Sequence, residues 1–293
     1  MTFSRRMLSA LIASGLASTA LCAAVAYRAP VPMESTLAPD FDRASATVGD
    51  GWVGYAIERT RSESGHHVSG TIHMSGGTWR MEGELLADRI PELAAELTAV
   101  DDRTSVIAVL MRVDKGGAVR QVRSSDASFP VDLEGKPLEW LGVVDPADGV
   151  ALLVSLYGAA RGVDARDDLI DAIGLHEDSS ATTFLTDIAR SGAHLHERES
   201  AVDALGGCGD TAAGPLLTEL ATSDPSIDLR ETAAEALAEI GDPAAIAALE
   251  KILHGSGDGR VRAASLEALA DAEAVEIDSM LRSVVIEERD EDV

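Results

Sequence analysis

Carboxylates recur every 32 residues in the C-terminal half of this 293-residue sequence. They form two rows, which we name the first acid row (Asp167, Glu199 and Glu231, interrupted by Ala263) and the second acid row (Asp171, Asp203, Glu235 and Glu267). The rows stand four residues apart, and residues at that spacing lie on one side of an α-helix. Such a stripe can bind a basic segment of a protein or a divalent cation. We predict that both rows form a partner-binding surface; acids scattered over a solvated face are the alternative.

Arginines recur with the same period and form a second candidate set: Arg166, Arg198, Arg230 and Arg262. One arginine in each repeat can pair with Asp178, Asp210 or a loop acid such as Asp228, and can so fasten neighbouring repeats together. A row of arginines that binds an anionic ligand is the alternative, which the many surrounding acids disfavour. We therefore expect a structural arginine ladder.

Histidines raise the possibility of a metal site. His66, His67 and His73 lie near one expected hairpin, and His194 and His196 lie in an expected loop. A zinc site needs three or four convergent ligands, and neither group supplies a full set at close spacing. The sequence also contains no G-x-S-x-G, P-loop, H-E-x-x-H or EF-hand pattern. We expect no metal, no cofactor and no enzymatic activity.

The 32-residue period predicts two helices in each repeat. The second of these, the B helix, carries the acid rows and buries a recurring apolar pair: Ala172-Ile173, Ala204-Leu205, Ala236-Leu237 and Ala268-Leu269. The first, the A helix, follows an acid that can cap its free backbone amides, at Asp178, Asp210 and Asp242. One such hairpin cannot bury its apolar face alone, so the repeats must stack. We predict an all-α solenoid over 146–293 with about 4.5 repeats, ending in a helix over 277–286.

The repeat also carries a family resemblance. Residues 229–245 (LRETAAEALAEIGDPAA) resemble the HEAT-like repeats named after phycobilisome lyases; 198–213 are similar, and 166–181 and 262–277 match more loosely. The resemblance implies a solenoid fold, but such repeats occur in lyases, hydroxylases and scaffolds. A β-rich segment before a helical array is also similar to the front end of lipid-transfer proteins of the vitellogenin kind, which implies lipid carriage.

The preceding residues, 49–145, have the composition of strands. A first strand is expected at Trp52–Ile57, followed by one hairpin around Ser75-Gly76-Gly77 and another around 114–117, with a helix over 90–100 between them. Residues 126–145 are expected to form an irregular connector, whose apolar end would seal the solenoid. The expected fold class is α+β: a small antiparallel β-rich domain followed by a short all-α HEAT-like solenoid.

The N-terminus has the pattern of an export signal. Arg5 and Arg6 precede an uncharged run from Met7 to Ala26, which ends in a small-x-small cleavage pattern. We expect a signal peptide over 1–26, with an uncleaved anchor as the alternative, and a flexible proline-containing linker over 27–48. Both alternatives predict an extracytoplasmic location, with membrane contact only through an uncleaved signal segment.

The net charge of −26 restricts the class of partner. Nucleic acids and anionic membrane surfaces would be repelled, so a basic protein is the expected partner. We therefore predict an exported, non-enzymatic HEAT-repeat scaffold that binds a protein through the acid rows. A lipid or apolar-ligand carrier is the first alternative. A lyase is the least favoured one, because bilin attachment is a cytosolic reaction and this chain carries an export signal.

Overall fold

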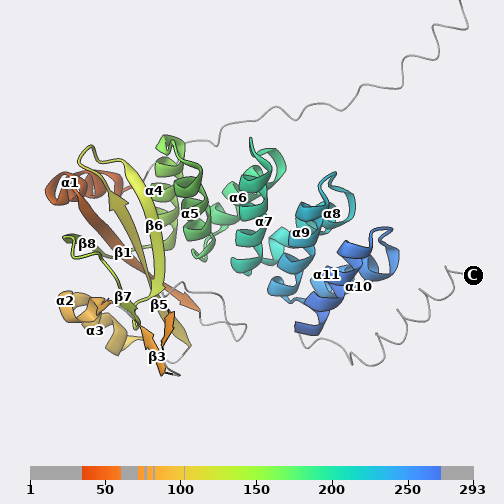
Figure 1. Cartoon of the computed structure of the whole chain (residues 1–293), viewed down its shortest axis with the longest axis horizontal. Coiled ribbons are helices and arrows are strands. Elements are labelled where there is room, and N and C mark those ends of the chain that lie inside the picture. Colours follow the sequence, from red (N-terminus) through yellow and green to blue (C-terminus); the bar gives the residue numbers. More distant parts are fainter. Residues whose placement is uncertain (1–34, 61–71, 76–77, 82, 102, 272–293) are drawn as a thin grey trace, which may run out of the picture.

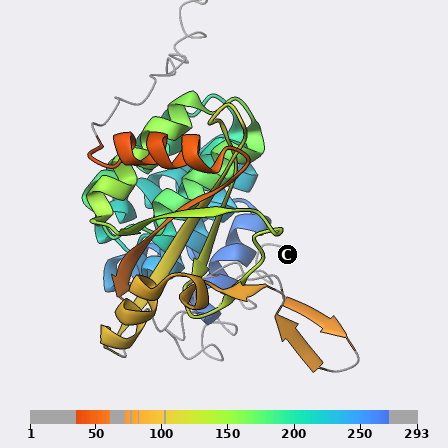
Figure 2. The same ribbon diagram turned by 90° about the vertical axis from the view of Figure 1, so that its left-hand side faces the viewer.

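The computed structural model describes residues 35–60, 72–75, 78–81, 83–101 and 103–271. Within them, a small sheet with its covering helices stands at one end of a row of α-helices (Figures 1 and 2). The predicted α+β fold class is confirmed. The expected signal peptide, His66, His67 and the expected helix over 277–286 lie outside the described residues.

A four-stranded sheet with the order β6-β5-β1-β8 forms the centre of the N-terminal part. Its strands are β1 (Gly51–Thr60), β5 (Thr104–Val113), β6 (Val119–Asp126) and β8 (Leu138–Val143). β5 pairs antiparallel with both β1 and β6, whereas β8 runs parallel to β1. The sheet is therefore mixed, and the expectation of a wholly antiparallel domain is wrong for its last strand.

β8 lies in the segment 126–145, where an irregular connector was expected, and that expectation is wrong. Leu138 and Trp140 alternate with Glu139, so they share one face of the sheet and pack against an apolar cluster there. The stretch 138–141, which was expected to seal the solenoid, completes the sheet, and of its apolar residues Leu141 packs against the core shared with the helical array.

Both faces of the sheet are covered. Along β1, Val53, Tyr55 and Ile57 belong to the core shared with the helical array, whereas Trp52 and Ala56 belong to a separate cluster. The side chains of α2 (Leu86–Arg89) and α3 (Pro91–Ala99) complete that second cluster, and α3 confirms the helix expected over 90–100. Alternation along the strand separates the two sets, and burial on both faces explains why β1 is apolar from Gly51 to Ile57.

Two short antiparallel pairs flank the sheet. β2 (Ile72–Ser75) pairs with β3 (Thr78–Met81) at the position of the first expected hairpin, and β4 (Glu84–Leu85) pairs with β7 (Pro130–Val131). The second expected hairpin is the connection between β5 and β6.

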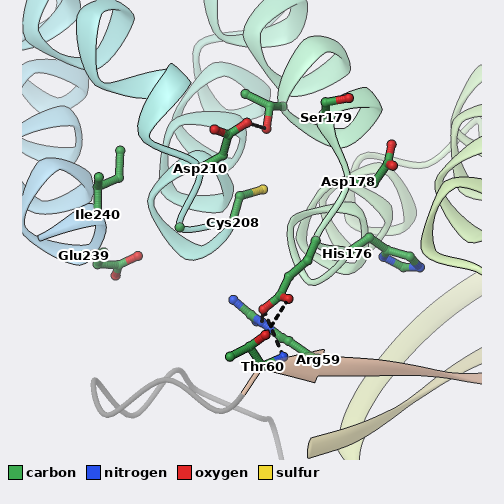
Figure 3. Close-up of a pocket in the computed structure, with 12 residues that line it drawn as sticks. Arg59, Thr60, His176, Asp178, Ser179, Cys208, Asp210, Glu239 and Ile240 are labelled. Atoms are coloured by element: carbon green, nitrogen blue, oxygen red, sulfur yellow. Dashed lines mark hydrogen bonds and ion pairs between the residues drawn. The ribbon is translucent and has the colours of Figure 1, made fainter. Parts of the chain in front are cut away.

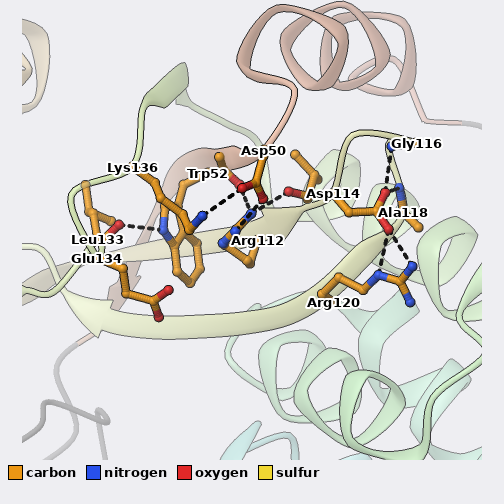
Figure 4. A network of polar contacts seen from close by, with 12 residues as sticks. Asp50, Trp52, Arg112, Asp114, Gly116, Ala118, Arg120, Leu133, Glu134 and Lys136 are labelled. Carbon is orange, nitrogen blue, oxygen red and sulfur yellow. Dashed lines mark hydrogen bonds and ion pairs between the residues drawn. The ribbon is translucent and has the colours of Figure 1, made fainter.

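A polar network supports the rim of the sheet (Figure 4). The side chains of Arg112 and Lys136 both bind Asp50, at 2.5 and 2.8 Å, and these two hydrogen bonds lower the pKa of Asp50 to about 2. Between β5 and β6, Asp114 Oδ1 accepts hydrogen bonds from two backbone amides of the turn, at 2.8 and 3.1 Å. The aspartate thereby fixes the turn that the sequence predicts.

The expected flexible linker over 27–48 is wrong in its second half, where Ala38–Val48 forms helix α1. Pro39 stands in the first turn, where a missing amide hydrogen is tolerated. Phe41 and Ala44 are three residues apart and bury their side chains in the core. Proline content was therefore a poor guide here, because prolines at the start of a helix do not interrupt it.

Within the described residues, four helical hairpins form the array, and each consists of an A helix followed by a B helix. They are α4 (Pro146–Ala159) and α5 (Val163–Gly174); α6 (Ser179–Ser191) and α7 (Leu195–Gly207); α8 (Gly214–Ser223, after a 3-10 turn at Thr211–Ala213) and α9 (Ile227–Ile240); and α10 (Pro243–Gly255) and α11 (Gly259–Asp271). Asp178, Asp210 and Asp242 each accept a hydrogen bond from a first-turn amide, as predicted. In the part of the chain that the structure describes, no helix has the length and apolarity needed to cross a membrane.

The sheet and the array share one continuous apolar core, which reaches from Phe41 to Leu269. At their junction, Tyr55 and His176 are fully buried, and the hydroxyl of Tyr55 lies 3.1 Å from Nε2 of His176. Gly149 of α4 lies against this pair, because a β-carbon at that position would come within 2.5 Å of the same nitrogen. Around this pair, the junction between the sheet and the array is closely packed.

Candidate partner-binding surface

The two acid rows lie on α5, α7, α9 and α11, and each of these B helices packs against the next. The members of the second acid row are all exposed, whereas those of the first are half-buried. The recurring Ala-Leu or Ala-Ile pair of each B helix is buried on the opposite side. The period predicted from the sequence therefore produces a surface of carboxylates along one side of the array.

Side chains from the following repeat lie beside two members of the first acid row. Nε2 of His196 lies 3.0 Å from Oδ2 of Asp167, and Nδ1 of the same ring lies 4.0 Å from Glu199. Arg260 forms ion pairs with Glu231 and with Asp228, at 2.5 and 2.7 Å. His196 and Arg260 are each the second residue of their B helix, and the sequence analysis did not identify them as partners of the acids.

Like charges are crowded in the second acid row. The pKa of Asp171 is raised to about 7, first by loss of water around the carboxyl and then by Asp203, Asp168 and Asp167. The residue as a whole is exposed to solvent, so the desolvation is confined to the surroundings of the carboxyl group. The pKa of Glu235 is also raised, again by desolvation and by neighbouring acids. A cationic group bound here would relieve this repulsion.

An open groove of about 490 Å³ lies between α7 and α9 and is lined by both rows. Its lining residues are all polar or charged: His196, Glu199, Ser200, Asp203, Asp228, Glu231, Thr232 and Glu235. Carboxylates on both walls can accept hydrogen bonds from an ammonium or guanidinium group. The geometry therefore suits a lysine or arginine side chain of a partner.

A second cavity, of about 540 Å³, lies where the C-terminal ends of the B helices meet β1 (Figure 3). Arg59 is 9% exposed and donates to the carbonyl of Gly207, while Thr60 donates twice to the carboxylate of Glu177, at 3.1 and 3.0 Å. These bonds fasten the sheet to the second helical hairpin and to the turn that precedes it. On the same wall, burial raises the pKa of the Cys208 thiol to about 12, so this thiol carries no thiolate chemistry at neutral pH.

The arginine ladder connects neighbouring repeats. In Arg198 and Arg230, Nε donates to a carbonyl near the end of the A helix of the same repeat, at 2.8 and 3.1 Å. The terminal nitrogen reaches the turn of the next repeat, where Asp224 accepts from Arg198 and Ser256 accepts from Arg230. Nη1 of Arg262 donates to the carbonyl of Ser256, at 3.0 Å.

Arg166 completes the ladder at the first repeat. Its guanidinium donates to Glu197, at 3.1 Å, and lies over the ring of Tyr157, whose hydroxyl also donates to Glu197. The partners expected from the sequence were different: Asp178 and Asp210 cap A helices instead, and Asp228 pairs with Arg260.

The histidines have other positions than the sequence suggested. His194 is the residue before α7 and His196 lies within it, so the pair is not in a free loop. Among the described residues, no group of three or more His, Cys, Asp or Glu side chains has the geometry to hold a metal ion. His176, which the sequence analysis did not single out, is the buried histidine of the junction, and burial lowers its pKa to about 4.

Comparison with known families supports the identity of the repeats. The family model for HEAT repeats matches residues 182–270, which include most of α6 and reach into α11. No curated protein matches the sequence. HEAT repeats generally act as non-enzymatic scaffolds in protein interactions, so the match indicates that kind of role. The narrower resemblance to the phycobilisome-lyase type stays a prediction.

Proposed function

We propose that this protein is an exported, non-enzymatic HEAT-repeat scaffold that binds a basic protein partner through the two acid rows. The observation that carries the proposal is the second acid row, whose carboxylates follow one another along successive B helices. Loss of water around the carboxyl, and then neighbouring acids, raise the pKa of Asp171 and of Glu235 there. Folding alone gains nothing from such crowding. A cationic partner would turn this repulsion into attraction and would be steered to the surface over a distance.

Export is part of the proposal and rests on the first 26 residues. Arg5 and Arg6 before an uncharged run that ends at Ala26 have the pattern of a signal peptide. An extracytoplasmic chain of this charge would meet basic segments of secreted or membrane proteins. Fractionation of cells that express the full chain tests this part, with N-terminal sequencing of the exported form. Full-length protein found only in the cytoplasm would contradict export.

Affinity capture tests the binding role. The wild-type protein is used as bait in an extracytoplasmic extract, beside an acid-row variant in which Asp171→Asn, Asp203→Asn and Glu235→Gln neutralise three of the four members of the second acid row. A matched variant loses the same charge on the A helices, through Asp187→Asn, Glu219→Gln and Glu250→Gln. The proposal expects a partner that the wild type and the A-helix variant retain and the acid-row variant loses. A partner held equally by all three proteins would contradict it.

A further inference from the structure

Three large apolar side chains stand exposed in register on the array. Val163, Leu195 and Ile227 are the first residues of α5, α7 and α9 and recur every 32 residues. Their exposed fractions are 51%, 42% and 37%. The other exposed large apolar side chains of the described residues (Leu85, Phe129 and Val143) belong to the N-terminal part and share no spacing. We name the three in register the apolar row.

The apolar row borders the acidic surface. Each of its members stands four residues before a member of the first acid row, on the same side of the helix. Side chains tilt toward the start of their helix, so the apolar row follows one edge of the surface. The fourth repeat has Gly259 and Ala263 at the two corresponding positions. The apolar row and the first acid row therefore occur together in three repeats and end at the same repeat.

We propose that this combined surface binds one amphipathic, basic α-helix of a partner protein. The inference rests on the proposed function and specifies the partner's shape and chemistry. Charge complementarity selects the occupant, because the acid rows attract lysine and arginine beside the apolar contacts. Residues 272–293 of this chain carry more acids than bases, and a second copy has the same net charge of −26, so both are poor occupants.

The spacing of the apolar row favours a helix over an extended strand. Packed helices lie about 8–10 Å apart, so neighbouring members of the row are separated by roughly that distance. Seven residues of an α-helix rise about 10.5 Å, which brings apolar residues at i, i+7 and i+14 onto the three members. In a strand, three residues cover about 10 Å, but side chains three apart point to opposite faces. The partner helix therefore carries an apolar residue at every seventh position, with lysine or arginine one turn away.

A pair of synthetic peptides tests this inference on the full chain. One is a labelled 21-residue peptide with leucine at every seventh position, flanked by lysines on the same face; the other has the same composition in scrambled order. Fluorescence anisotropy gives the dissociation constant of each peptide for four proteins. These are the wild type, a Leu195→Ser and Ile227→Ser variant, a control with Leu85→Ser and Phe129→Ser, and the acid-row variant described above.

The inference expects the ordered peptide to bind the wild type and the control about tenfold more tightly than the scrambled one. The Leu195→Ser and Ile227→Ser variant should lose this preference but still bind both peptides. Equal binding of the two peptides by the wild type, or a preference that survives in that variant, would overturn the inference and leave the proposed function standing. Unchanged binding of both peptides by the acid-row variant, or no binding at all, would overturn the proposed function itself. Circular dichroism checks that each variant is folded.

Discussion

At the scale of single residues, the two acid rows differ in their surroundings. His196 and Arg260 lie beside the first acid row, whereas the described partners of Asp171 in the second row are mainly other acids. The sequence predicts the positions of both rows, because they depend only on the helical repeat. It does not predict the raised pKa values of Asp167, Asp171 and Glu235, since these depend on burial and on which side chains from neighbouring repeats lie beside each carboxyl.

The raised pKa of Asp171 predicts a pH-dependent effect of Asp171→Asn. The pKa of the Asp171 carboxyl is about 7 in the folded protein and has its ordinary value of 3.8 in the unfolded chain. Protonation of this carboxyl therefore stabilises the folded protein at low pH, and the stabilisation is lost as the pH rises to about 7. The variant should therefore melt about 1–2 °C above the wild type at pH 8 and nearer to it at pH 5.5. Thermal unfolding at the two pH values measures this. Asp187→Asn on α6 is the control, and an equal effect of both substitutions would contradict the assignment.

The arginine ladder predicts unequal effects of two equivalent substitutions. Asp224 is 5% exposed, so Arg198→Met leaves a buried carboxylate without its cation and should destabilise the fold by about 3 kcal/mol. Arg230→Met removes a hydrogen bond to a neutral hydroxyl and should cost only about 1 kcal/mol. Urea unfolding gives both values. Ser256→Asp places a carboxylate where Asp224 stands in the preceding repeat, so it should increase the destabilisation caused by Arg230→Met. If the effects of the two substitutions simply add, the carboxylate does not interact with the arginine, and this explanation of the unequal effects is wrong.

At the scale of helices and strands, features that depend on neighbours in the sequence could be predicted, and features that depend on distant contacts could not. The A-helix caps and the turn at Asp114 follow from residues within a few positions of each other. β8 escaped prediction because its partner, β1, lies far away in the sequence. The apolar row has a visible 32-residue spacing, but the sequence does not show that its members are exposed, because recurring apolar residues of the buried core have the same spacing.

Two glycines of α4 test the packing of the junction. A β-carbon at Gly149 would come within 2.5 Å of His176, whereas one at Gly158 would meet no atom within 4 Å. Gly149→Ala should therefore destabilise the protein by about 1–3 kcal/mol. Gly158→Ala should stabilise it by about 0.5–1 kcal/mol, through its higher helix propensity alone. Urea unfolding of the two variants measures the pair. Equal effects would mean that the helix–sheet junction is looser than this structure shows.

At the scale of the whole molecule, the continuous core makes the sheet the end cap of the array. One face of the sheet packs on α4 and α5, and the opposite face is closed by α2 and α3. The sequence predicts the two parts and their order. It does not predict their union, because Tyr55 and His176 meet across 121 positions.

Shared packing predicts that the two parts unfold together. All three tryptophans, Trp52, Trp79 and Trp140, lie in the N-terminal part, so their fluorescence reports on that part. Circular dichroism at 222 nm reports mainly on the helices. Thermal or urea transitions followed by the two signals should coincide. Two separate midpoints would show that the array and the sheet are independent units.

The most direct test of the acidic binding surface is the affinity of a lysine-rich decapeptide for three proteins, measured by isothermal titration at low salt. They are the wild type, the second-acid-row variant and the A-helix variant, the last two having equal net charge. The account predicts that the acid-row variant binds about tenfold more weakly, whereas the A-helix variant changes by less than about twofold. Equal weakening in the two variants would contradict it, because binding would then follow net charge and not this surface.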